Sequence, residues 1–135
     1  MRWIVLFWVG MTVLGLIFLA GSLVWAGWFA DASQPLPAGL PRWAFPLLAL
    51  PVVVAVFGYG FAIWRVWRRQ PAINAWLVGI AGHFAYLVAD ITLSGGISAA
   101  EVFSLDGIGS WIRVLAPGLV ILMIERDRYW NPDLR

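Results

Sequence analysis

Cysteine and lysine are both absent from this sequence, and histidine occurs once, as His83. Without cysteine, the chain cannot form a disulfide, a thiolate metal site or an iron–sulfur cluster, and it has no thiol nucleophile. Without lysine, it cannot hold a cofactor through a Schiff base. With one histidine, it cannot build a multi-histidine metal site by itself, and we predict no metal site.

Charged residues are also scarce, because they make up 12% of the 135 residues, whereas 62% are hydrophobic. Soluble domains carry about 25% charged residues, and disordered segments have low hydrophobicity. The composition therefore excludes both classes and predicts an all-α integral membrane protein with a single transmembrane domain over residues 1–135. The arginines flank the apolar runs instead of forming a separate basic domain, so we expect no nucleic-acid partner.

Four apolar segments are long enough to cross the hydrocarbon core, which takes ~20 residues of α-helix. We expect transmembrane helices at about 3–29, 43–67, 71–92 and 107–126, arranged as an up-down bundle. The first segment is longer than the apolar region of a secretory signal peptide, about 7–15 residues, so we expect a retained helix. Ser98 to Glu101 has the pattern of a capping box, which predicts a short interfacial helix near 99–105. Gly107 and Gly109 favour a break before the fourth helix.

The nine cationic residues, all arginines, are unevenly divided between the two sides of such a bundle. One side would hold Arg2, Arg65, Arg68, Arg69, Arg126, Arg128 and Arg135, and the other would hold Arg42 and at most Arg113. Since arginine-rich loops stay in the cytoplasm, both termini are predicted to be cytoplasmic in a multi-pass protein of the cell membrane. The ten tryptophans fall near predicted helix ends, as expected for an aromatic belt.

Gly79, His83, Tyr86 and Asp90 are spaced to fall on one face of the third predicted helix. His83 lies close to the bilayer midplane, and polar groups at that depth face protein or water, which makes them functional candidates. Three interpretations stay open for His83. It can form a neutral hydrogen bond between helices, ligate a haem or chlorophyll, or relay protons or ions together with Asp90.

The small-x-x-x-His pattern of Gly79 and His83 resembles the pigment-binding pattern of bacterial light-harvesting polypeptides. The resemblance covers one helical turn, and those polypeptides have a single span. It implies that His83 would be the axial ligand, while Gly79 and Gly82 would let a flat macrocycle approach the backbone. We expect no cofactor, because one histidine leaves the other face of a haem without a strong ligand; a haem or chlorophyll on His83 is the alternative.

Arg113 lies inside the fourth predicted helix, at about the depth of His83. A central arginine costs roughly 2.5–3.5 kcal/mol to insert, so we expect it to form an ion pair. Asp90 is the first expected partner, and Asp106, seven residues earlier on the same helical face, is the second. An anionic lipid headgroup, a quinone carbonyl or a substrate is the alternative ligand.

Small residues in the first two predicted helices favour close contact between helices, although no strict Gly-x-x-x-Gly occurs in the first. They are Gly10, Gly15, Gly21, Ser22, Gly58 and Gly60. Farther along the chain, residues 125–128 alternate between negative and positive charge. This pattern predicts that the fourth helix ends at the level of the lipid headgroups with its charges balanced.

No catalytic constellation is present, because the chain has no nucleophile beside a base and no phosphate-binding loop. We therefore expect no enzyme. We expect a small accessory or anchor subunit of a larger respiratory or photosynthetic membrane complex, in contact with the lipid bilayer and with other membrane subunits or further copies of itself. The alternative is a small oligomeric transporter or channel that uses His83, Asp90 and Arg113 as an intramembrane polar pathway.

Overall fold

The computed structural model of the chain describes residues 2–29, 41–94, 100 and 104–130. Within these residues four long helices occur, and no strand: α1 (Arg2–Trp28), α2 (Ala44–Trp67), α3 (Ile73–Ser94) and α5 (Leu105–Trp130). All four are long and apolar enough to cross a membrane. The predicted all-α architecture with four apolar helices is therefore confirmed. The predicted interfacial helix near 99–105 falls largely outside the described residues.

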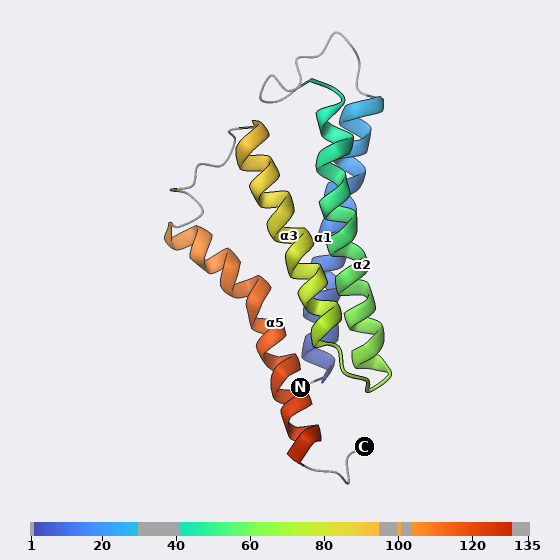
Figure 1. Ribbon diagram of the computed structural model, residues 1–135, viewed down its shortest axis with the longest axis vertical. Coiled ribbons are helices and arrows are strands. Elements are labelled where there is room, and N and C mark those ends of the chain that lie inside the picture. The colour runs from blue at the N-terminus through green and yellow to red at the C-terminus, as the bar shows by residue number, and fades with distance from the viewer. Residues whose placement is uncertain (1, 30–40, 95–99, 101–103, 131–135) are drawn as a thin grey trace.

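The helices alternate in direction, so the start of α1 and the end of α5 lie at the same end of the molecule (Figure 1). We call this the closed end; it also holds the turn at residues 68–72 between α2 and α3. The open end holds the start of α2 and the end of α3. Figure 1 shows α1, α2 and α3 side by side, while α5 leans away from α3 toward the open end.

Ser104 decides where α5 begins. Its hydroxyl oxygen accepts a hydrogen bond from the Gly107 backbone N–H at 3.2 Å, which is the geometry of an N-cap serine. The Ser104 carbonyl accepts the next bond, from the Ile108 N–H at 2.8 Å. The helix therefore starts at Leu105 and runs through Gly107 and Gly109, so it begins two residues before the predicted start at 107.

The core of the bundle is built around α2, which contributes more buried residues than any other helix. The main cluster consists of Val5, Val9, Leu16, Val52, Ala55, Tyr59, Ala62, Val66, Ala72, Ala75, Trp76 and Ile121. Most of these residues lie in the half of each helix nearer the closed end. Because lipid tails are as apolar as these side chains, close van der Waals packing would hold such helices together in a membrane.

Glycines bring α2 and α3 into direct backbone contact. A Cβ atom on Gly58 would collide with the backbone of Gly79, and one on Gly82 would lie 2.6 Å from the Ala55 nitrogen and 2.8 Å from the Pro51 carbonyl oxygen. The expected close contact at Gly58 is thus confirmed. Four other glycines that sequence analysis favoured have open space around the Cβ position: Gly10, Gly15, Gly21 and Gly60.

The turn between α2 and α3 is a Schellman motif without glycine. Arg69 has a φ of 57°, the left-handed conformation that closes this motif. The Arg69 N–H donates to the Val66 carbonyl at 3.2 Å, and the Gln70 N–H donates to the Arg65 carbonyl at 2.8 Å. The Arg65 guanidinium also donates to the Pro71 carbonyl at 2.8 Å, which fixes the chain just before α3.

Candidate functional site

His83 lies where three helices meet. Its ring centroid is 6.5 Å from that of Tyr59 on α2 and 6.5 Å from that of Trp111 on α5. Phe84 extends the cluster, with its ring 6.2 Å from Trp111. The Nδ1 atom of His83 is buried and has no hydrogen-bond partner among the described residues. An imidazole nitrogen in this position can serve as a donor or an acceptor for a polar group that enters between α3 and α5.

Tyr59 is a member of the site that sequence analysis missed. Its side chain is 2% exposed, its ring covers Gly79, and its hydroxyl has no hydrogen-bond partner in the described part of the chain. An unpaired buried hydroxyl costs about 1–3 kcal/mol. The signal available in the sequence was a single tyrosine between Gly58 and Gly60 in an otherwise apolar segment.

The tetrapyrrole interpretation of His83 meets a steric objection. The glycines that would admit a flat macrocycle already face α2: the ring of Tyr59 occupies the space beside Gly79, and the backbone at Ala55 occupies the space beside Gly82. The one-turn resemblance to light-harvesting polypeptides therefore does not extend to the surroundings of the histidine. Within the described residues, no group of three or more metal-ligating side chains comes together.

The rest of the α3 stripe continues from His83 toward the open end. Tyr86 is half-buried and packs against the core cluster. Asp90, one turn farther on, is also half-buried, and it is close enough to Tyr86 for an electrostatic interaction with the phenol. The helix thus places His83, Tyr86 and Asp90 along one line, as the spacing predicts.

Arg113 does not join this line. Its side chain is exposed, and it forms no salt bridge with Asp90 or with any other residue that the structure describes. The physical reason is an offset in depth: Trp111 beside His83 and Gly118 beside Trp76 place Arg113 level with the first half of α3, whereas Asp90 lies farther toward the open end, where α5 leans away from α3 (Figure 1). The side chain of Asp106, the second expected partner, lies outside the described residues.

Two contacts fix the level of α5 against α3. The ring of Trp76 packs onto Gly118, and the ring of Trp111 lies beside His83. Trp76 and His83 are seven residues apart on α3, and Trp111 and Gly118 are seven residues apart on α5. Both spacings correspond to about 10.5 Å along a helix, so the two contacts match in depth. Trp111 is therefore level with the middle of α3. Trp76 lies in the first turn of α3, near a helix end as predicted, but it is only 6% exposed because its ring packs onto α5.

Glu125 joins the end of α5 to the start of α3. One carboxylate oxygen accepts hydrogen bonds from the Ala72 and Ile73 backbone N–H groups, at 2.5 and 3.0 Å. The first N–H groups of a helix lack partners within the helix and carry the positive end of its dipole, so a carboxylate is well placed there. Sequence analysis treated Glu125 only as part of a mixed charge run. The missed signal is Gln70-Pro71, a helix start without a capping side chain of its own.

Comparisons with protein-family models, curated proteins and solved structures find no match to this chain. The arguments about function therefore rest on the arrangement of these residues.

Proposed function

We propose that this chain is a small multi-pass membrane protein that serves as an accessory or anchor subunit of a larger membrane complex, of the respiratory or photosynthetic kind. Its four helices have the length and hydropathy for crossing a bilayer. The described arginines support cytoplasmic termini, since Arg2, Arg65, Arg68, Arg69 and Arg126 lie toward the closed end and arginine-rich flanks stay in the cytoplasm.

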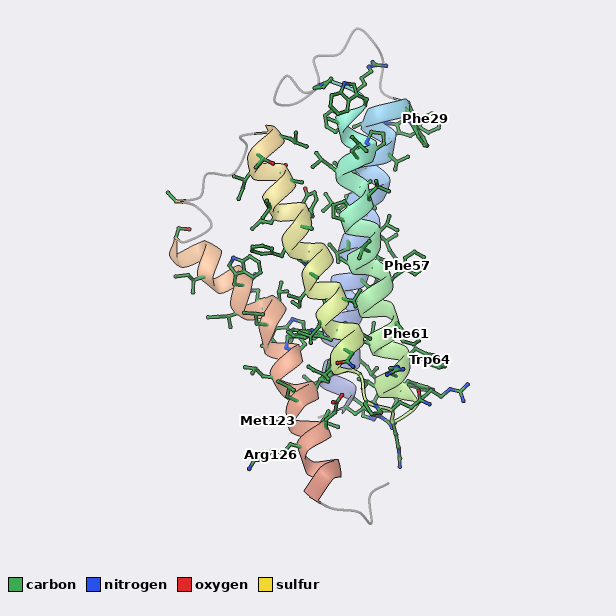
Figure 2. All side chains as sticks on the ribbon, viewed as in Figure 1. Phe29, Phe57, Phe61, Trp64, Met123 and Arg126 are labelled. Atoms are coloured by element: carbon green, nitrogen blue, oxygen red, sulfur yellow. The ribbon has the colours of Figure 1, made fainter. Side chains whose placement is uncertain are left out.

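The main support for this proposal is that α5 makes few contacts with the other helices of the chain. The buried share of α5 is similar to that of α1 and α3, but α5 makes far fewer contacts with its neighbours than α2 makes with α1 or α3. Figure 2 shows Met123 and Arg126 of α5 pointing away from the other helices. A helix that shares so little surface with its own bundle has room to pack against another chain.

Exposed apolar side chains surround the whole bundle, as a lipid-facing or subunit-facing surface requires. Phe57, Phe61 and Trp64 project outward from α2 on the side away from α5 (Figure 2), and Phe57 is 73% exposed. These side chains would contact lipid, while the region between α3 and α5 would contact partner subunits.

The transporter alternative receives less support. It needs His83, Asp90 and Arg113 to converge on one polar pathway, but Arg113 is exposed and forms no salt bridge with Asp90. The two side chains also lie at different depths, because Arg113 follows Trp111, which lies beside His83, while Asp90 lies seven residues beyond His83 toward the open end. We therefore retain the subunit hypothesis as the proposed function.

Purification from native membranes tests the proposal. A tagged copy at native expression level, extracted in mild detergent, should retain other membrane proteins in fixed stoichiometry, and their cofactors would identify the type of complex. A tagged, unrelated small membrane protein is the control for nonspecific recovery. Isolation of a lone homo-oligomer that supports solute flux in liposomes would contradict the subunit proposal.

A further inference from the structure

Arg113 lies at mid-helix depth in the described bundle. It follows Trp111, which lies beside His83, and it precedes Gly118, which lies against Trp76. Its backbone is therefore level with the segment of α3 between Trp76 and His83. Since α3 runs from Ile73 to Ser94, this level is near the middle of the helix and far from both ends.

The described residues next to Arg113 are apolar, and none of them pairs with its charge. Its neighbours along the chain are Ile112, which is 61% exposed, and Val114, which is half-buried. The guanidinium has no salt bridge with any residue that the structure describes. In a bilayer, ionisable residues at this depth face protein or water and pair with an opposite charge, and no described residue of this chain meets that requirement.

We propose that Arg113 is the docking point for a transmembrane helix of a partner subunit, and that this helix carries an aspartate or glutamate at the same depth. This inference rests on the proposed function and specifies its partner. A guanidinium and a carboxylate form two parallel hydrogen bonds in addition to the charge attraction. The pair would fix both the depth and the rotation of the partner helix against α5.

The described carboxylates of a second copy do not lie at that depth. A parallel copy holds its own groups at the depths seen here: Asp90 lies seven residues beyond His83, about 10.5 Å toward the open end. Glu125 lies near the closed end and already accepts two hydrogen bonds from α3. An antiparallel copy would reverse the distribution of arginines. A different chain therefore fits better than self-association.

Site-specific photo-crosslinking in native membranes tests the partner. A photoreactive residue at position 112, beside Arg113, should form a crosslink to a membrane-spanning segment with an Asp or Glu within one helical turn of the crosslinked residue. The same residue at position 57, on the outer side of α2 (Figure 2), is the control and should not reach that segment. Crosslinks from position 112 only to lipid, or to a second copy, would overturn the inference.

Substitution of Arg113 provides the second measurement. Arg113→Leu should reduce recovery of the complex by about tenfold or more, while the melting temperature of the purified chain stays the same. Arg113→Lys should retain more complex than Arg113→Leu, and Arg126→Leu, at an exposed arginine near the end of α5, should retain all of it. Arg113→Asp combined with an arginine in place of the partner's carboxylate should restore assembly. If Arg113 only stabilised its own chain, this exchange of charges would not restore it.

Failure of this inference differs from failure of the proposed function. If the wild-type chain retains its partners and Arg113→Leu retains them equally, the docking role of Arg113 is refuted and the subunit role stands. If the wild-type chain is recovered alone, the subunit role itself is refuted.

Discussion

The closed and open ends of the bundle differ in how their helices are held. At the closed end, the Trp3 and Trp67 rings pack edge to face at 5.6 Å, Trp76 packs onto Gly118, and Glu125 caps α3. Toward the open end, α5 leans away from α3 (Figure 1). One sequence thus builds a tightly packed half and a half in which α5 leaves surface unshared, and we propose that a partner binds in the second half.

The largest loss in the free energy of unfolding should come from replacing one of the two tryptophans that fix the depth of α5 against α3. Trp76→Ala removes a buried ring that fills the space above Gly118 and should cost about 3–5 kcal/mol in the free energy of unfolding. Trp111→Ala removes a half-buried ring nearer the open end and should cost clearly less. Thermal unfolding in detergent measures both, and equal losses would contradict the difference between the two ends.

Glycine packing between α2 and α3 should give the next largest effect. Gly58→Ala places a Cβ against the backbone of Gly79 and should cost about 1–3 kcal/mol through overpacking. Gly60→Ala, two residues away, meets nothing within 4 Å and should be neutral or slightly stabilising. The same unfolding measurement on both variants checks this prediction, and a destabilised Gly60→Ala would refute it.

Removal of the Glu125 cap should have a moderate effect confined to the closed end. Glu125→Ala leaves the Ala72 and Ile73 N–H groups without their acceptor and should cost about 1–2 kcal/mol. Glu125→Gln keeps an acceptor oxygen and should cost less. Arg126→Ala, at the next position but exposed, is the control. Amide hydrogen exchange should show faster exchange at the start of α3 in Glu125→Ala alone.

The smallest effect concerns the pair that the sequence predicts between Asp90 and Arg113. Since the structure forms no salt bridge between these two described residues, their alanine variants should be additive within about 0.5 kcal/mol in the isolated chain. A double-mutant cycle in detergent measures the coupling. Strong coupling between the two variants would restore the sequence-based prediction and remove the need for an external carboxylate.

Orientation can be tested without affecting stability, because the chain has no cysteine of its own. A single cysteine at Gln70, exposed at the closed end, should be protected in intact cells from a membrane-impermeant thiol reagent. One at Pro41, exposed near the start of α2 at the open end, should be labelled. The reverse pattern would place the termini outside.

The sequence by itself determined the four helices, their approximate ends and the division of arginines between two sides. These properties depend on length, hydropathy and local spacing, which act within one segment. The helical stripe of His83, Tyr86 and Asp90 belongs to the same class, because a regular helix fixes which residues share a face.

The tertiary structure alone decided which of these residues meet across helices. Gly58 contacts α3 while Gly60 does not, although both lie in the same apolar segment. Glu125 finds its partners 52 and 53 residues away, and Arg113 stays apart from Asp90 because the packing of Trp111 beside His83 and of Trp76 onto Gly118 sets the two at different depths. The rotation and tilt of one helix against another arise from the summed packing of many side chains, and a shift of a few ångströms changes each pairing. Local sequence patterns carry no information on that scale.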